Sequence, residues 1–307
     1  GPQKRAYRKV IYLVRGAMPG FSGLFTRDAL FALAGRDDVE SRLVVRDQTR
    51  WTLAHGPFRR ADFDALPERN WTLLVQGVNL VHPAGEALLR RFSFLPYARL
   101  DDLMVSYAAP GGGVGPHFDS YDVFLLQGGG RRRWRYGRQD SHALKPGVPL
   151  KILRRFVPAH DAVLAPGDML YLPPHIAHDG IALDPGCQTW SVGFRSPSFK
   201  ELLQEGLWRL AESLEDIPEL EQKFADPKQK ATHSAEQLPE ELIQQLSSKL
   251  KALKLDQING FLPGITSYLS EPKQQAIFEP PNKPLNPKQF QKALEANKLT
   301  PHPYTRI

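Results

Sequence analysis

A series of short apolar runs, joined by turns rather than helices, constrains the fold of this chain more than any other feature. The runs are rich in β-branched and aromatic residues, and glycine–proline turns such as Pro166-Gly167-Asp168 separate them. They cover residues 103–107, 122–126, 132–136, 162–164, 169–172 and 189–194. Many short strands without intervening helices indicate a sandwich or a barrel. A mainly β fold with some α, a double-stranded β-helix of the jelly-roll and cupin type, fits best.

The first hundred residues add strands and two helices to this roll. Further strand candidates occupy residues 9–14, 41–45, 51–54 and 71–75. Thr26 is a good N-cap for a helix through residue 33, and residues 83–94 form the second candidate helix. We expect all of these elements to belong to a catalytic domain spanning residues 1–198.

The pattern changes to a helical period after Ser198. Apolar residues at 199, 202, 203, 207, 210 and 214 form one stripe, and those at 238, 242, 243, 246, 250 and 253 form another. Residues 1–197 hold 22 of the 24 arginines, whereas residues 198–307 hold 12 of the 16 lysines. These shifts predict a helical module over 199–280. Its apolar stripe could pack on the roll or on a second copy. A small third domain begins in 281–307, with a helix over 286–299 that has Pro287 in its first turn.

Composition limits the kinds of partner and compartment. A net charge of +7 and a pI near 9.4 fit either an acidic partner such as nucleic acid or a merely solvated basic surface. The single cysteine, Cys187, excludes an internal disulfide and suits a reducing cytoplasm. The sequence has no apolar stretch of 18 residues, so we expect no membrane span.

The candidate metal ligands are His117, Asp119 and His178. Residues i and i+2 of a strand point to the same face, so His117 and Asp119 can reach one ion, and His178 can arrive from a distant strand. Two imidazoles and one carboxylate leave open positions on an octahedral ion, which is the facial triad of non-haem Fe(II) oxygenases. His175 competes with His178, but its odd spacing from His178 places it on the opposite face. The alternative is a pair of structural histidines.

A cluster of arginines follows the first ligand strand. Alternation in a strand turns Arg132 and Trp134 to one face and Arg131, Arg133 and Arg135 to the other. An inward guanidinium inside a barrel calls for a carboxylate, which it can bind in bidentate fashion. Arg132 is therefore expected to hold the far carboxylate of 2-oxoglutarate, while the other three form a solvated basic ribbon.

Two other residues are candidates for the same cosubstrate. Ser106 lies on the strand before the glycine-rich segment 110–116 and could donate its hydroxyl. Arg195 is a second, weaker candidate for the carboxylate anchor.

The block 111–124, Gly-Gly-Gly-Val-Gly-Pro-His-Phe-Asp-Ser-Tyr-Asp-Val-Phe, carries a family resemblance. With residues 104–137, 166–183 and 191–197, it resembles the bacterial JmjC-type (YcfD-like) ribosomal oxygenases, which are Fe(II)/2-oxoglutarate oxygenases that use O2. The resemblance implies that His117, Asp119 and His178 bind Fe(II) and that Arg132 binds 2-oxoglutarate. It also implies a helical dimerisation module, hence a homodimer, and a C-terminal winged helix of which 281–307 is only the start.

The resemblance further implies a substrate class. Bacterial members hydroxylate an arginine of a large-subunit ribosomal protein, and eukaryotic relatives hydroxylate ribosomal histidines. An arginine needs acidic or aromatic neighbours, and Tyr121 and Asp122 are candidates that could equally be packing residues. His175 departs from the family pattern, where a smaller residue is expected. The alternatives are a histidine hydroxylase, a JmjC lysine demethylase, a cupin-fold protein without catalysis, and an RNA-binding protein.

Overall fold

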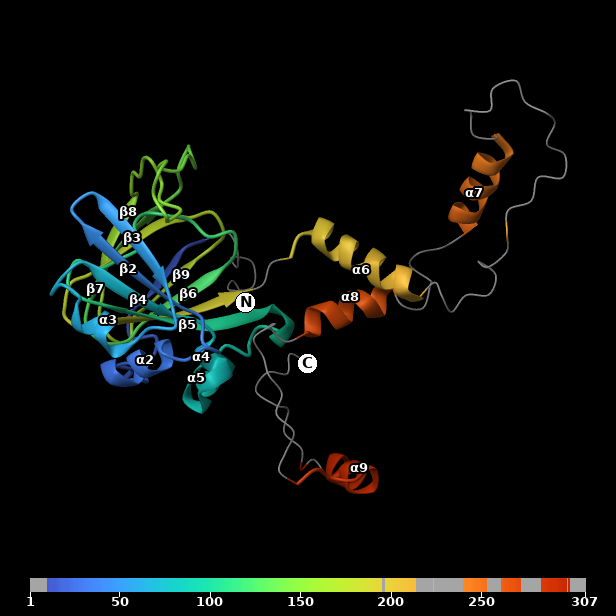
Figure 1. Ribbon diagram of the computed structural model, residues 1–307, viewed down its shortest axis with the longest axis horizontal. Coiled ribbons are helices and arrows are strands. Elements are labelled where there is room, and N and C mark those ends of the chain that lie inside the picture. Colours follow the sequence, from blue (N-terminus) through green and yellow to red (C-terminus); the bar gives the residue numbers. More distant parts are fainter. Residues whose placement is uncertain are drawn as a thin grey trace. The chain divides into compact units, whose positions relative to one another are not determined.

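The computed structural model describes residues 10–194, 197–213, 223, 240–252, 261–271, 283–296 and 298 (Figure 1). The chain divides into two compact units. One comprises residues 1–196 and 272–307, and the other comprises residues 197–271. The catalytic and dimerisation roles expected for the parts of the chain remain predictions.

The first unit is built on two antiparallel sheets. The large sheet has the strand order β1-β9-β6-β11-β5-β4-β2-β3 and the small sheet has the order β10-β7-β8. The large-sheet strands, in that order, are Tyr12–Val14, Met169–Leu172, Val123–Gln127, Cys187–Phe194, Leu100–Ala108, Trp71–Val75, Ser41–Asp47 and Arg50–His55. The small-sheet strands are Ala177–Ala182, Arg132–Gly137 and His160–Leu164. The expected mainly β roll is therefore present.

The central strands of the large sheet, such as β4, β6 and β11, are buried on both faces, whereas the edge strands β1 and β3 are largely exposed. Alternate residues such as Leu103, Val105 and Trp190 belong to a core shared with the helices on one side. Figure 1 shows α2 (Arg27–Ala34), α4 (Val78–Val81) and α5 (Pro83–Arg90) together on the side of the large sheet away from β8. A short helix, α3 (Arg60–Asp64), contributes Phe63 to this core, and η1 (Tyr97–Arg99) precedes β5.

The opposite face of the large sheet meets the small sheet. Leu125 and Leu170 of the large sheet share a second core with Trp134, Tyr136 and Leu164 of the small sheet. Fully burying each such side chain contributes about 1.5–3 kcal/mol. This packing holds the two sheets together as a roll and leaves one face of β7 directed inward.

Local signals explain where the helices begin and end. The Thr26 hydroxyl accepts a hydrogen bond from the Ala29 backbone N–H, so the predicted N-cap of α2 is confirmed. Helix α5 starts with Pro83 at its first position but ends at Arg90, four residues before the predicted end at 94. Residues 91–94 form turns instead, and Phe92 packs into the core from there.

Arg15 and Gly16, near the N-terminus, contact the turn before β9. The Asp168 carboxylate accepts hydrogen bonds from the Gly16 and Ala165 backbone N–H groups and pairs with the Arg15 guanidinium at 2.6 Å. Burial alone would raise the pKa of Asp168, but these three partners together lower it below its ordinary value.

The second unit contains α6 (Phe199–Ser213), α7 (Glu240–Ala252) and α8 (Phe261–Ser270). Helices α6 and α8 pack closely at Gly206, where a Cβ would lie 2.8 Å from the Phe261 ring. Arg209 of α6 also pairs with Glu271 at 2.5 Å. The stripe positions 214, 238 and 253 lie outside the described residues. No helix in the described ranges has the length and apolar character needed to cross a bilayer.

Helix α9 (Pro287–Glu295) lies near the end of the chain. Its N-cap, Asn286, and Gln289 form a capping box, each side chain accepting from the other's backbone N–H. This helix lies within the expected start of a winged helix, which remains a prediction.

Candidate metal centre

The segment before His117 runs along the free edge of β10 and joins the two sheets. The Gly111 N–H donates to the Ala182 carbonyl at 2.8 Å, and the Ala182 N–H donates to the Gly112 carbonyl at 2.9 Å. A Cβ on Gly112 would lie 2.1 Å from the Trp71 carbonyl oxygen, and one on Gly113 would lie 2.5 Å from the Gly180 carbonyl oxygen. Glycine is therefore required here because the backbones approach too closely for any side chain.

The same pairing brings the two histidines together. The His117 N–H donates to the His178 carbonyl at 3.0 Å, and the His178 N–H donates to the His117 carbonyl at 2.8 Å. His117, Asp119 and His178 each offer a ligand atom, and these atoms lie within 4.8 Å of one another. Among the described residues this is the one group of three or more such side chains close enough to share an ion.

Hydrogen bonds orient both imidazoles toward the space between them. His117 Nδ1 lies 2.9 Å from the Gly115 carbonyl oxygen, and His178 Nδ1 lies 3.0 Å from the Ile176 carbonyl oxygen. A carbonyl can only accept, so each Nδ1 donates a proton to it and each Nε2 is the atom that faces a metal. This arrangement is typical of metal-binding histidines.

The protonation state of His178 favours metal binding. Burial and then the neighbouring His117 lower the pKa of His178 to about 4, although the Asp119 carboxylate and the Ile176 carbonyl oppose them. The ring is therefore neutral at pH 7, and its 3.7 Å separation from Asp119 is not a salt bridge there. Two imidazoles and a carboxylate form a ligand set that suits a divalent ion of the Fe(II) type.

His175 lies outside this group. It is exposed and has a left-handed backbone with φ of 63°, and its N–H donates to the Asp119 carbonyl at 2.7 Å. Its ring lies 5.9 Å from the Phe118 ring and 6.2 Å from the His142 ring, outside the metal cluster. The geometry thus favours His178 over His175 as the third ligand.

Arg132 points into the roll, as expected from the alternation in β7. The side chain is 3% exposed, and its Nε and Nη2 have no hydrogen-bond partner in the described part of the chain. Its Cζ lies 5.9 Å from the centroid of the Trp134 ring, which is itself 5.8 Å from the His178 ring. A buried guanidinium with unpaired N–H groups near a metal site fits an anionic ligand such as a carboxylate.

Other polar groups share this interior. The Ser106 hydroxyl donates to the Thr189 carbonyl at 3.4 Å, so this candidate is buried and already engaged. Thr72 Oγ1 and Trp134 Nε1 are buried without a partner in the described part of the chain. Thr72 is not among the residues predicted from the sequence. Only the pairing of β4 with β5 places it opposite Ala108, two residues along β5 from Ser106. Arg195 lies outside the described residues.

The expected basic ribbon is wrong in one respect. Its arginines do face outward, but each is paired with an aspartate rather than merely solvated. The pairs are Arg131–Asp184, Arg133–Asp161 and Arg135–Asp179. Their positive charge is therefore largely neutralised on this face.

The two predicted substrate contacts differ in environment. Tyr121 is 40% exposed, and its pKa is raised by burial of the hydroxyl and then by the carboxylates of Asp119, Asp102 and Asp101. Asp122 is fully buried and accepts a hydrogen bond from the Tyr171 hydroxyl at 2.6 Å. The burial of Asp122 argues against the predicted substrate contact and assigns this side chain to the core.

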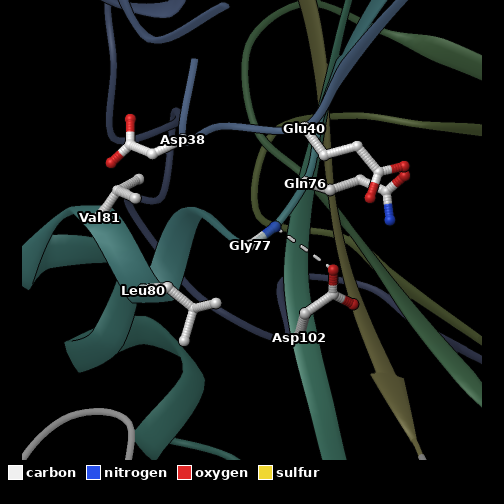
Figure 2. Close-up of a pocket in the computed structure, with 7 residues that line it drawn as sticks. All are labelled: Asp38, Glu40, Gln76, Gly77, Leu80, Val81 and Asp102. Atoms are coloured by element: carbon white, nitrogen blue, oxygen red, sulfur yellow. Dashed lines mark hydrogen bonds between the residues drawn. The ribbon is translucent and has the colours of Figure 1, made fainter. Parts of the chain in front are cut away.

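An acidic pocket of about 400 Å³, open mouth included, contains one of the carboxylates near Tyr121 (Figure 2). In Figure 2 the carboxylate of Asp102 points toward the backbone N–H of Gly77, at 3.3 Å. The lining residues are Asp38, Glu40, Gln76, Gly77, Leu80, Val81 and Asp102. No local pattern predicts this pocket, because its carboxylates come from separate segments of the chain.

Comparisons with known proteins agree with this architecture. The JmjC domain family matches residues 87–202. The ribosomal protein uL16 3-hydroxylase of Escherichia coli K12 is 36% identical over 310 residues, covering 96% of this chain and 78% of that protein. A probable ribosomal oxygenase of Haemophilus influenzae is 38% identical over 201 residues, covering 64% of this chain and 49% of that protein.

Solved structures give the same result. The X-ray structure of E. coli YcfD superposes with a TM-score of 0.80 at 34% identity, covering 96% of this chain and 77% of that chain. YcfD in complex with cobalt and 2-oxoglutarate superposes with a TM-score of 0.76 at 35% identity, covering 96% and 76%. A further complex of that protein holds cobalt and succinic acid.

Proposed function

Because the chain belongs to the JmjC ribosomal oxygenases, we propose that it is an Fe(II)- and 2-oxoglutarate-dependent dioxygenase that hydroxylates an arginine side chain of a large-subunit ribosomal protein. One observation carries the proposal. Three oriented metal donors and an unpaired buried guanidinium lie along the inner side of one small sheet and the segment paired with its edge.

Each residue has a defined role in this proposal. His117, Asp119 and His178 would hold Fe(II) through two Nε2 atoms and a carboxylate oxygen. When bound, the metal supplies O2 activation coupled to conversion of 2-oxoglutarate to succinate and CO2. Arg132 would fix the far carboxylate of 2-oxoglutarate with its free N–H groups, and Ser106 could turn its hydroxyl to the same ligand.

The surroundings of Tyr121 support a cationic substrate. An exposed phenol ring flanked by Asp101 and Asp102 offers a face for a planar guanidinium and carboxylates for its N–H groups. Hydrogen bonding fixes the guanidinium so that one side-chain carbon lies near the metal, which is the main task of the protein in such chemistry. The E. coli relative is named for uL16, and this supports a large-subunit ribosomal protein as substrate.

The assembly and location follow from the same proposal. Phe199 is 91% exposed and Trp208 is 70% exposed on α6, which supports a homodimer formed through the helical unit. The start of a winged helix in 281–307 remains part of the proposal. We expect the protein to act in the cytoplasm, where its ribosomal substrate is made.

Product analysis tests the proposed reaction. The protein, supplied with Fe(II), 2-oxoglutarate and an arginine-containing peptide from a large-subunit ribosomal protein, should form succinate and add one oxygen atom to the arginine. Oxygen on a histidine would favour the histidine hydroxylase, and loss of methyl groups from a methyl-lysine peptide would favour the demethylase. RNA binding or ligand binding without turnover of any peptide would contradict an enzymatic function.

Variants test the metal ligands. His117→Ala and Asp119→Ala should abolish both turnover and the visible spectrum of bound Co(II) while leaving the fold largely intact. His55→Ala removes an exposed imidazole from the outer strand β3 and is the matched control. Full activity in either ligand variant would contradict the assignment.

A further inference from the structure

The segment between β7 and β8, residues 138–158, forms a hairpin beside the metal centre. The Lys145 N–H donates to the Ile152 carbonyl at 2.8 Å, and the Arg154 N–H donates to the Ala143 carbonyl at 2.8 Å. Figure 1 shows this region as yellow-green loops projecting near β8. We refer to residues 138–158 as the basic hairpin.

The basic hairpin is anchored directly to the segment that carries the first metal ligand. Ile152 and Leu153 are each 1% exposed, so the returning strand is fixed by burial. The Leu153 N–H donates to the Pro116 carbonyl at 2.7 Å, one residue before His117. The hairpin is therefore a fixed neighbour of the metal centre rather than a distant loop.

The charges on the basic hairpin are not neutralised within the described structure. Five exposed cations oppose a single acidic residue, Asp140. The cations are Arg138, Lys145, Lys151, Arg154 and Arg155. None of them forms an ion pair with a carboxylate of the described residues. The outward arginines of the adjacent strand β7, by contrast, all have an aspartate partner. A fixed group of unpaired cations is suited to a polyanionic ligand.

Aromatic rings lie at the base of the basic hairpin. The His142 ring lies 4.2 Å from the Phe118 ring and 6.2 Å from the His175 ring. Both histidines are exposed, and His175 holds its position with a positive φ that residues with a side chain rarely adopt. Such a conformation is found preferentially at functional sites. Exposed rings beside cations can stack on nucleic-acid bases.

We propose that the basic hairpin, with His142 and His175, binds RNA next to the metal centre. Cations alone would also suit an acidic peptide, but the rings favour a ligand with planar bases. The carboxylates around Tyr121 suit a basic protein, which the hairpin would repel. A role in selecting a ribosomal protein that is already associated with RNA rests on the proposed function, whereas the RNA site itself does not.

Fluorescence anisotropy of a labelled single-stranded RNA, titrated with the full chain over a series of salt concentrations, tests the proposal. The variant Lys145→Gln/Lys151→Gln/Arg154→Gln should bind at least about tenfold more weakly at low salt. Its slope of log K against log salt should be smaller by about 2, because each single-strand phosphate contact contributes about 0.7. His142→Ala should weaken binding by about fivefold or more with an unchanged slope, because stacking is uncharged.

A matched control removes the same charge elsewhere. Lys288→Gln/Lys292→Gln/Lys298→Gln changes exposed lysines on and after α9 and should bind RNA as the unmodified protein does. Wild-type affinity in the hairpin variant, or loss of binding in the α9 variant instead, would overturn the proposal. Equal competition by poly-glutamate would show an acidic-peptide surface instead. If the triple variant does not fold, Lys151→Glu alone, at the exposed tip, should still reduce affinity.

The test also separates this inference from the proposed function. With a short arginine peptide and no RNA, the triple hairpin variant should form succinate at the wild-type rate. RNA binding by a protein that forms no succinate with any peptide would refute the hydroxylase while leaving the RNA site in place. Succinate formation without salt-dependent RNA binding would refute the RNA site and leave the hydroxylase in place.

Discussion

Replacing Arg132 with methionine should stabilise the ligand-free protein and remove its response to 2-oxoglutarate. The guanidinium is 3% exposed, and two of its nitrogens have no partner among the described residues. Each unpaired buried donor costs about 1–3 kcal/mol. Methionine fills a similar volume without polar atoms, so the free energy of unfolding should rise by about 1–4 kcal/mol. For a unit of this size each kcal/mol shifts the melting temperature by about 2–4 °C.

The same substitution should weaken 2-oxoglutarate binding greatly. A charge-assisted hydrogen bond contributes about 1.5–3 kcal/mol, so losing two of them costs about 3–6 kcal/mol, or a factor of roughly 10²–10⁴ in affinity. At one hundred times its dissociation constant, 2-oxoglutarate should stabilise the unmodified protein by about 2.7 kcal/mol. The variant should show no such gain at the same concentration, and its KM for the peptide should change far less than its KM for 2-oxoglutarate.

Thermal unfolding with and without Co(II) and 2-oxoglutarate provides the assay. Arg133→Met is the matched control, because Arg133 is an exposed neighbour on the opposite face of β7 and pairs with Asp161. That change should alter stability by less than about 1 kcal/mol and leave the 2-oxoglutarate response intact. An Arg132→Met protein that is less stable, or that still responds fully to 2-oxoglutarate, would refute the reasoning.

Three further substitutions test other parts of the structure. Asp102→Asn keeps the acceptor for its backbone partner but removes the charge, so KM for the arginine peptide should rise about tenfold or more while KM for 2-oxoglutarate stays constant in steady-state assays. Asp168→Asn should cost about 1–3 kcal/mol at neutral pH. The folded-state pKa of Asp168 lies below the ordinary 3.8. The difference in free energy of unfolding between the two proteins, measured by urea unfolding, should therefore shrink as the pH falls below that value. A difference that stays constant with pH would contradict this prediction. Gly180→Ala would place a Cβ 2.7 Å from the Trp134 ring, so it should destabilise the protein by about 1–3 kcal/mol in the same measurement, and no loss would show that the ring can move freely.

The strands of the roll were predictable because their signal is local. Residues 103–107 and 132–136 fall within β5 and β7, and turn residues bound both strands. The order of the strands was not predictable in the same way. Strand β11 pairs with β5 and β6, which lie far earlier in the chain, and all eight of its residues are buried, so no alternation marks its two faces.

The candidate site was predictable where a short-range rule applied. Alternation along β7 turned Arg132 inward, and His117 and Asp119 do lie together at the metal site. The strand expected for these two ligands is absent, because His117 forms only an isolated bridge with His178 and no strand includes residues 117–119. The errors came from long-range contacts. Asp122 has its Tyr171 partner 49 residues away, and the outward arginines have partners 28 to 53 residues away, which spacing cannot reveal.

The paired amides and carbonyls of His117 and His178 have a consequence for the loss and rebinding of the metal. These two ligands are far apart in sequence, and backbone hydrogen bonds hold them together without the ion that they would share. Removing the metal with a chelator should therefore leave the ligand geometry of the site preformed. Reloading would then be a matter of diffusion and dehydration, with no rebuilding of the chain.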